Sequence, residues 1–338
     1  MAHAQPLETA PGRSIVVTCA ADRKYLRPLA VTLRSLIAHL EPGRTLAIHA
    51  IDGNIPDAEK ALLARSVCTP TVTLSWHVPD RSRLLGVPLW GRMPISVYDK
   101  LLVPDLLPPD VDQAVWLDSD TLVLADVAPL WDGGTSGRPV LAVQDTLVPL
   151  VSARFGVARY RELGLRNEAK YFNAGVMLMN LGLWRQRQVT DRALEYLKEY
   201  AGDVSFWDQE GLNAVLADEW GELDQAWNWS VSVGRTPGWG RRRLPSDAAP
   251  EPRIVHFSGN LKPWTYPGVH PFYGTYYRYV DGGPWPGWRP RRSWRTAAVS
   301  VYEQSALRRV LRPLERFGTA LWMTLTRRVA TAADLQSA

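Results

Sequence analysis

Two aspartates one residue apart end an apolar run near the middle of the sequence. Asp118 and Asp120 follow Ala114–Leu117 and flank Ser119. Residues i and i+2 of an extended chain share a face, so both carboxylates can reach one cation. Apolar residues on both sides pull the pair toward the interior, where an unpaired charge is costly. The spacing therefore predicts a divalent-metal site at the end of a buried strand; the alternative is a pair of caps exposed at a sheet edge.

A second pair with the same spacing has a different context. Asp110 and Asp112 follow Pro108 and Pro109, which predicts a polar turn with solvated carboxylates. Spacing alone therefore does not define a metal site, and the apolar flanks of Asp118 and Asp120 distinguish that pair.

Short apolar runs alternate with stretches of helical periodicity, which predicts an α/β fold with a parallel sheet and helices on both faces. In such sheets ligands bind beyond the carboxyl ends of the strands, where Asp118 and Asp120 fall. A further stretch, Trp239–Pro252, predicts an irregular loop or lid. The expected strands are Ser14–Ala20, Thr45–Ile51, Thr71–Val78, Ala114–Val123, Pro139–Val143, Tyr171–Met179 and Arg253–Phe257, and the expected helices are Tyr25–Leu40, Pro56–Val67, Pro94–Leu107, Trp184–Tyr200 and Asp208–Ala217.

Four segments, in this order, resemble glycosyltransferase family 8, the retaining nucleotide-sugar transferases that include bacterial lipopolysaccharide galactosyltransferases and glycogenin. The resemblance implies a GT-A fold, a Rossmann-like nucleotide-sugar-binding domain with a mostly parallel central sheet. It places this catalytic domain at residues 14–283 and leaves 284–338 as an extension. The segments are Ala20–Tyr25 (AADRKY), Trp116–Val123 (WLDSDTLV), Tyr171–Trp184 (YFNAGVMLMNLGLW) with Asp208–Asn213 (DQEGLN), and His256–Trp264 (HFSGNLKPW).

The resemblance implies that Asp118, Asp120 and His256 hold a metal ion. Carboxylates, an imidazole and diphosphate oxygens suit Mn²⁺, with Mg²⁺ as the alternative. Lys262 stands where the family places a cation on the β-phosphate, and Gly259 would let the backbone approach that phosphate. Outside this context His256 would be interpreted as a core histidine and Lys262 as an unpaired surface lysine.

The remaining donor contacts also come from the resemblance. Asp208 would accept hydrogen bonds from sugar hydroxyls and Gln209 would lie beside the anomeric carbon, as the catalytic candidates. Asp22 and Asp208 could instead cap helices. Lys100 stands where the family usually has arginine; it keeps the charge but lacks the bidentate fork. The nucleotide-sugar-binding residues implied are Asp22 and Tyr25 at the uracil, Lys100 at the diphosphate or donor sugar, and Ser119, Asn173 and Ala174 along the donor.

We therefore expect a metal-dependent retaining transferase that moves galactose or glucose from a UDP-sugar to a glycan, lipid-linked or other hydroxyl acceptor. Because Gln209 is an amide and a poor nucleophile, front-face attack through an oxocarbenium-like ion pair is favoured over a covalent intermediate. A sugar-1-phosphate nucleotidylyltransferase should show a Gly-rich phosphate loop after its first strand, where this sequence has AADRKY. A non-catalytic sugar-nucleotide-binding protein is the other alternative.

Composition is that of a globular protein, with 46% hydrophobic and 22% charged residues among 338. The net charge of +5 is uneven, because residues from Pro284 onward hold ten arginines and three acids and the rest is slightly acidic. This argues against a nucleic-acid-binding core. The two cysteines, Cys19 and Cys68, are too few for a disulfide framework and are expected to be buried.

The arginine-rich extension has apolar residues at helical spacing from Val299, with Pro313 expected to kink the helix. Such a basic amphipathic stretch is typical of segments that lie on anionic membrane surfaces; the alternative is a helix packed on its own domain. The sequence shows no signal-peptide pattern and no apolar run of membrane-spanning length. We expect a cytoplasmic protein, peripheral on the inner face of the plasma membrane.

Overall fold

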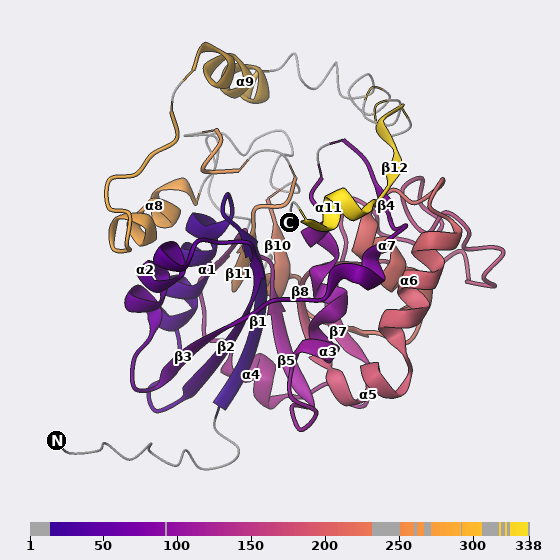
Figure 1. Ribbon diagram of the computed structural model, residues 1–338, viewed down its shortest axis with the longest axis horizontal. Helices are drawn as coiled ribbons and strands as arrows, with labels where there is room; N and C mark the ends of the chain where they lie inside the picture. The colour runs from indigo at the N-terminus through magenta and orange to yellow at the C-terminus, as the bar shows by residue number, and fades with distance from the viewer. Residues whose placement is uncertain are drawn as a thin grey trace.

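The computed structural model describes residues 14–91, 93–231, 251–259, 262–266, 272–291, 293–305, 318, 322 and 325–336. Its centre is a seven-stranded sheet in the order β3-β2-β1-β5-β8-β7-β9 (Figure 1). β8 is antiparallel to both of its neighbours, and the other six strands share one direction, so the mostly parallel α/β sheet is confirmed. The strands are β1 (Ser14–Asp22), β2 (Thr45–Gly53), β3 (Val72–His77), β5 (Gln113–Leu117), β7 (Val140–Gln144), β8 (Phe172–Asn180) and β9 (Gly221–Glu222).

The central strands of this sheet are buried on both faces, which is why β5 and most of β8 are apolar. Side chains of β5 alternate between two cores: Val115 and Leu117 join one, Ala114 and Trp116 the other. Helices cover each face in turn. The first core includes α1 (Leu26–Ala38), α2 (Asp57–Val67) and α4 (Ala128–Asp132), and the second includes the 3₁₀ helix η2 (Ile95–Leu102), α3 (Val103–Leu106), α5 (Leu181–Gln186), α6 (Val189–Glu199) and α7 (Trp207–Leu216).

The acidic strand expected over Ala114–Val123 is two strands. β5 ends at Leu117, and β6 (Thr121–Val123) belongs to a second sheet with β10 (Trp229–Ser230) and β11 (Ile254–His256). β11 runs antiparallel to β6, with His256 opposite Thr121. The acidic pair therefore lies in the turn between the sheets, and the second sheet brings His256 beside it.

Two expected helices differ from the structure. Pro94–Leu107 is mainly the 3₁₀ helix η2, because Pro104 has no N–H to donate to the Lys100 carbonyl. Trp184–Tyr200 is divided into α5 and α6 at Gln188, which has a left-handed φ of 52°. The expectation for Cys19 is confirmed, whereas Cys68 is exposed because it follows the last turn of α2 at the surface.

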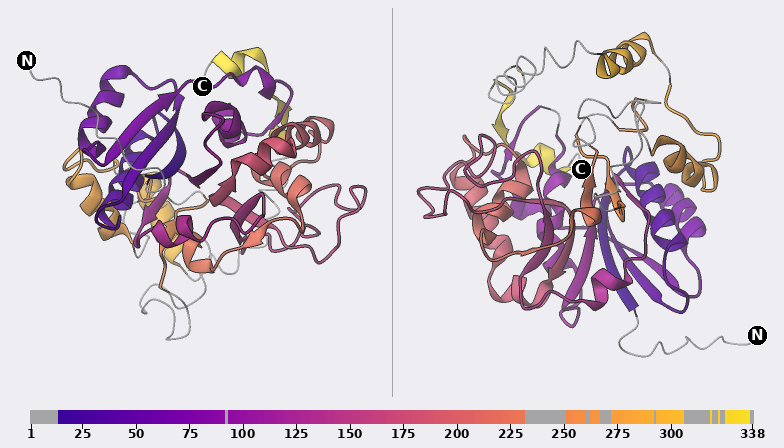
Figure 2. Two further views of the ribbon diagram at one scale, coloured as in Figure 1. Left: turned by 90° about the horizontal axis from the view of Figure 1, so that it is seen from below. Right: turned by 180° about the vertical axis from the view of Figure 1, so that it is seen from behind.

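The C-terminal extension returns to the main domain. α8 (Tyr273–Asp281), the last helix before the extension, packs on α1, as both views of Figure 2 show, and α9 (Trp294–Gln304) of the extension stands apart from the sheet layers. Further on, β12 (Arg328–Val329) pairs antiparallel with β4 (Pro88–Leu89) and is followed by α11 (Ala332–Gln336). Most of the amphipathic stretch expected after Val299, including Pro313, and residues 239–250 of the expected loop lie outside the described residues. Among those described, no helix has the length and apolarity needed to cross a bilayer.

Candidate functional site

The predicted metal ligands meet at the carboxyl end of β5. One donor atom from each of Asp118, Asp120 and His256 lies within 4.8 Å of the other two. His256 Nε2 is 3.2 Å from Asp120 Oδ1 and 3.8 Å from Asp118 Oδ2. A Cβ on Gly175 of β8 would lie 2.2 Å from His256 Cε1, so the glycine makes room for the ring. Two carboxylates and an imidazole fit Mn²⁺, and the residues present suit the implied metal.

Helix α1 fixes the turn that carries the two acids. The hydroxyl of Thr32 lies 2.8 Å from the Thr121 carbonyl oxygen and 3.1 Å from that of Ser119. Ser35 Oγ accepts a hydrogen bond from Val123 N at 3.0 Å, and both α1 side chains are fully buried. Ser119 itself donates its hydroxyl to the Ala20 carbonyl of β1. The candidate donor residue Ser119 is thus placed at the site with its side chain already bonded.

Lys262 is partly buried and lies beside the acidic pair, so the alternative of an unpaired surface lysine is wrong. Its Nζ contacts the Asp120 carboxylate and donates to the Phe257 carbonyl at 2.5 Å. Burial raises the pKa of Asp120, but the charge of Lys262 and the hydrogen bonds from Lys262 and His256 outweigh burial and hold that pKa far below its ordinary value. Gly259 has φ of +80°, a conformation that favours glycine.

Lys100 joins the metal cluster to the catalytic candidates. Its Nζ lies 2.9 Å from Asp208 Oδ2 and 3.2 Å from Asp118 Oδ1, and it donates to the Ala174 carbonyl at 3.1 Å. Burial lowers the pKa of Lys100, yet the two carboxylates reverse this and raise it above its usual value. Asp208 makes no capping bond in α7, so the helix-cap alternative for this residue is wrong.

Asp22 and Tyr25 lie at the same end of the sheet. Asp22 Oδ1 accepts a hydrogen bond from Tyr25 N at 2.8 Å in the turn before α1, but the N-cap of α1 is Tyr25, so the helix-cap alternative for Asp22 is wrong. The Tyr25 ring packs edge-on against Trp264 at 5.8 Å between centroids. Burial, followed by the charges of Asp120, Asp22 and Asp118, raises the pKa of Tyr25, which shows how close the ring lies to the acidic turn.

The candidate Gln209 is held at both ends of its amide. Its Oε1 accepts from Ala174 N at 3.1 Å and its Nε2 donates to Asp145 Oδ2 at 3.2 Å. Asn173 donates to the same Asp145 oxygen at 2.9 Å. Gln209, Asn173 and Ala174 are therefore brought together as the resemblance implied.

Two residues of this site were missed by sequence reasoning. Asp145 directly follows β7, in the same context in which Asp118 follows β5, so strand position could have identified it. Asn228 accepts from the ring of His256 at 3.0 Å. It lies between Trp227, which is buried in the core, and Trp229, and no sequence signal distinguishes it.

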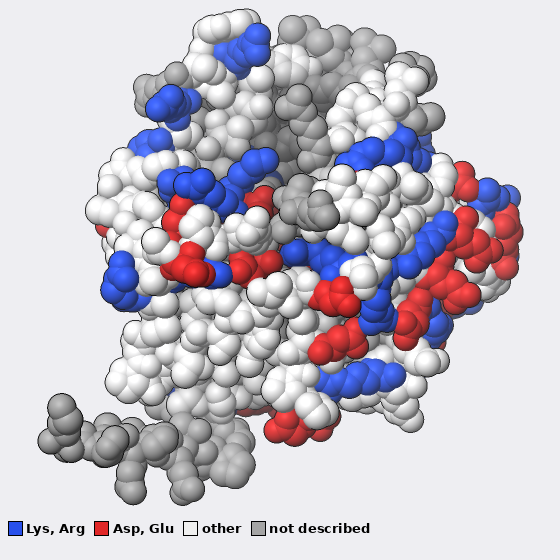
Figure 3. All heavy atoms as spheres, in the orientation of Figure 1, with Lys and Arg blue, Asp and Glu red and all other residues white. Residues whose placement is uncertain are grey.

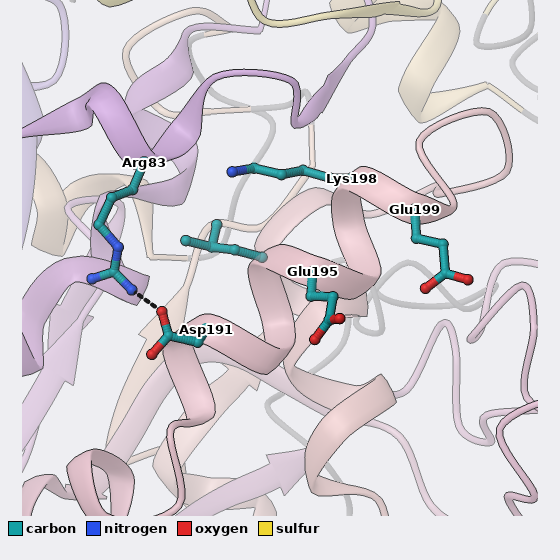
Figure 4. A pocket seen from close by; sticks show the side chains of 6 residues that line it. Arg83, Asp191, Glu195, Lys198 and Glu199 are labelled. Carbon is teal, nitrogen blue, oxygen red and sulfur yellow. Dashed lines mark hydrogen bonds and ion pairs between the residues drawn. The ribbon is translucent and has the colours of Figure 1, made fainter.

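A surface hollow of about 550 Å³ lies elsewhere, between Arg83 and α6 (Figure 4). Arg83 reaches across it to Asp191, and the rest of the lining is apolar Leu194 with three charged residues of both signs, Glu195, Lys198 and Glu199. None of the candidate site residues lines it. We regard the metal cluster as the functional centre, because the chemistry-bearing side chains converge there.

Comparisons with known proteins agree with this geometry. The sequence model of glycosyl transferase family 8 matches residues 16–268. General stress protein A of Bacillus subtilis (strain 168) is 28% identical over 278 residues, which cover 80% of this chain and 94% of that protein. Lipopolysaccharide 1,3-galactosyltransferase of Salmonella typhimurium is 22% identical over 272 residues, covering 78% and 77%.

A solved structure shows the same fold. The galactosyltransferase LgtC, in complex with donor and acceptor sugar analogs, matches with a TM-score of 0.67 at 23% identity, over 80% of this chain and 96% of that chain. The GT-A fold expected from the sequence is thereby confirmed.

Proposed function

Because the chain belongs to glycosyl transferase family 8, we propose that it transfers galactose or glucose from a UDP-sugar to a hydroxyl of a glycan or lipid-linked acceptor, with retention of configuration. The observation that carries the proposal is the convergence of Asp118, Asp120 and His256 beside two lysines, buried Lys100 and partly buried Lys262. We assign catalysis to residues 14–283 and a separate role to 284–338. The Salmonella relative, by its name a galactosyltransferase, supports the hexose.

The site is suited to a pyrophosphate leaving group. Mn²⁺ held by Asp118, Asp120 and His256 would act as a Lewis acid on the diphosphate, and Mg²⁺ is the alternative. Lys262 and Lys100 place two further positive charges at the same end of the sheet. Preorganised charge of this kind stabilises a departing UDP without a general acid.

The surroundings of Gln209 support front-face attack. Its carbonyl oxygen is already bonded to Ala174 N, Asp208 is paired with Lys100, and buried Glu210 accepts from Ser205 N at 2.6 Å. These contacts hold the three side chains in place, and we favour a mechanism in which the departing phosphate oxygen accepts the acceptor's proton. Incubation with donor alone should give no glycosyl-enzyme; an adduct on Asp208 detected by mass spectrometry would overturn this mechanism.

Donor hydrolysis over a panel of UDP-sugars with Mn²⁺ tests the activity. Asp120→Ala should lower turnover by at least about 100-fold, because it removes a ligand and the partner of Lys262, while circular dichroism stays unchanged. Asp110→Ala is the matched control from the second aspartate pair, which is exposed. Binding of UDP-sugar without turnover of any donor would favour the non-catalytic alternative, and full activity of Asp120→Ala would contradict the proposed site.

We further propose that the extension docks on anionic membrane at the inner face of the plasma membrane. Trp294 and Val301 of α9 are 77% and 70% exposed. The charged side chains drawn around α9 at the top of Figure 3 are basic. In sedimentation with vesicles that contain anionic lipid, the variant Trp294→Ser should no longer sediment with the vesicles. Val78→Ser, which alters an equally exposed residue of the catalytic domain, should sediment like the wild type. Equal binding by both variants would contradict docking through α9.

A further inference from the structure

Consecutive hydrogen bonds between buried and partly buried side chains connect the metal cluster to the catalytic candidate. His256 Nδ1 lies 3.0 Å from Asn228 Oδ1, and Asn228 Nδ2 lies 2.9 Å from Asn173 Oδ1. Asn173 Nδ2 donates to Asp145 Oδ2, which also receives Nε2 of Gln209. Asn228 is 5% exposed and His256 is also 5% exposed, so water does not compete for the hydrogen bond between these two side chains.

The donor and acceptor of every hydrogen bond in this series are determined by the groups at its two ends. Asp145 receives four N–H donors, two on each oxygen, and thus acts only as an acceptor; the other two come from Leu147 N and Val148 N. Asn173 must turn its NH₂ toward Asp145, and its oxygen then accepts from Gly175 N, which can only donate.

The same logic reaches the histidine. Because the Asn173 oxygen is an acceptor, Asn228 must present its NH₂ there and its oxygen to His256. His256 Nδ1 must then carry a hydrogen. The lone pair of the neutral ring is left on Nε2, the nitrogen that faces Asp118 and Asp120.

We infer that Asn228 is a positioning residue, which holds His256 as the Nδ1–H tautomer so that Nε2 is presented to a divalent cation. The inference rests on the proposed function for the identity of that cation. Ligating histidines are generally oriented by an acceptor on the second ring nitrogen, and loss of that acceptor typically costs 10–100-fold in metal affinity. Here the acceptor is an amide whose own orientation is set by Asp145.

The tautomer can be measured without any metal. Nitrogen-15 spectra of the metal-free protein, at a pH where the ring is neutral, distinguish a protonated Nδ1 from an unprotonated one, and His256→Gln assigns the signal. We expect Nδ1 of His256 to be protonated in the wild type and to lose that preference in Asn228→Ala. An unprotonated Nδ1 in the wild type would overturn the inference.

Metal affinity supplies the second readout. Titration of Mn²⁺ in the presence of UDP, followed by electron paramagnetic resonance of the free ion, should show affinity about 10–100-fold weaker in Asn228→Ala. Asn228→Asp should recover most of it, because a carboxylate also accepts from Nδ1–H. Wild-type affinity in Asn228→Ala would contradict a positioning role.

A matched control separates positioning from loss of folding stability. Thr190 is as buried as Asn228, and its hydroxyl donates to the Leu101 carbonyl at 2.6 Å, away from the cluster. Thr190→Val should lower the free energy of unfolding but leave Mn²⁺ affinity unchanged. If the wild type binds no Mn²⁺ with UDP, the proposed metal function fails, whereas the nitrogen-15 result still decides the role of Asn228.

Discussion

Gly175 leaves room for little more than a hydrogen atom between β8 and the ring of His256. A methyl group there would lie 2.2 Å from Cε1 and 2.6 Å from Nδ1, well inside van der Waals contact. We expect Gly175→Ala to displace the imidazole from the acidic pair and to weaken Mn²⁺ binding at least about 10-fold, as loss of a ligand's orientation does. The measurement is Mn²⁺ titration with UDP, alongside donor hydrolysis.

Gly274 provides the control for that variant. It lies within α8, and a Cβ there would meet no atom of the described residues within 4 Å. Gly274→Ala should leave metal binding unchanged and raise helix stability by up to about 1 kcal/mol. If Gly175→Ala binds Mn²⁺ like the wild type, the close contact with His256 does not control the site.

The buried side of α1 stabilises the conformation of the turn that contains Asp118 and Asp120. Thr32 is fully buried and bonds the turn carbonyls of Thr121 and Ser119. Thr32→Val keeps the volume but leaves these carbonyls without the hydroxyl, which should cost about 1–3 kcal/mol of unfolding free energy and reduce turnover. Urea denaturation and donor hydrolysis measure the two effects.

Thr45 at the start of β2 is the matched comparison. Its buried hydroxyl has no hydrogen-bond partner within the described part of the chain. Thr45→Val should therefore be neutral or slightly stabilising. Equal losses in both variants would mean that the hydroxyl of Thr32 has no special role in the turn.

Elements built from local pattern were predictable from the sequence, whereas those decided by distant pairing were not. Periodicity and strand ends located β1, α1 and the acidic turn, and the resemblance supplied His256. The break between β5 and β6 was missed because β6 is defined by its pairing with β11, more than 120 residues later. The reversed direction of β8 has no local sequence signal for the same reason.

Individual site residues divide in the same way. Lys100 and Gln209 were assigned by resemblance, and the structure places Lys100 against Asp118 and Gln209 against the backbone of Ala174. Asn228 was missed because its importance comes from one hydrogen bond to His256, which no composition or spacing records. Asp145 could have been found by applying the strand-end rule to β7 as well as to β5.

An ion pair within the C-terminal segment, here called the carboxylate clasp, joins Arg328 to Asp334 and makes the stability of this segment dependent on pH. Arg328 binds both oxygens of Asp334 at 2.7 Å, and Thr331 N donates to the same carboxylate at 2.9 Å. The Arg328 guanidinium lowers the pKa of Asp334 from 3.8 to about 2. Because the pKa is lower in the folded state, the clasp stabilises above the unfolded value and is lost as pH falls toward about 2.

The variant Asp334→Asn tests this clasp. At neutral pH it should have a lower Tm than the wild type, and the difference should shrink as pH falls from about 4 to about 2. Because Arg328 is 43% exposed and solvent screens the pair, we expect a small shift. Asp57→Asn, at a fully exposed carboxylate of α2, provides the comparison; a Tm difference that grows on acidification would contradict the assignment.

The far end of the chain also reaches the catalytic domain through aromatic rings. Trp322 packs edge-on against Trp90 at 5.3 Å, and Trp90 stacks on Trp207 at 4.2 Å. Trp207 directly precedes Asp208 and has a left-handed φ of 40°, which is unfavourable for a bulky residue and must be held by its neighbours. The C-terminal segment thus supports the start of α7, where the catalytic candidates begin.

Removal of residues 319–338 should therefore lower Tm and also reduce donor hydrolysis, because Trp90 and Trp207 lose part of their packing. Trp294→Ala, on the exposed surface of α9, should leave both unchanged. Membrane docking alone would predict the opposite result in vesicle-free solution, with full activity after truncation. The end of the extension packs on the catalytic domain, whereas α9 earlier in the extension is exposed. The structure is therefore compatible with both domain packing and membrane docking, and donor hydrolysis by the truncated enzyme without lipid separates their contributions.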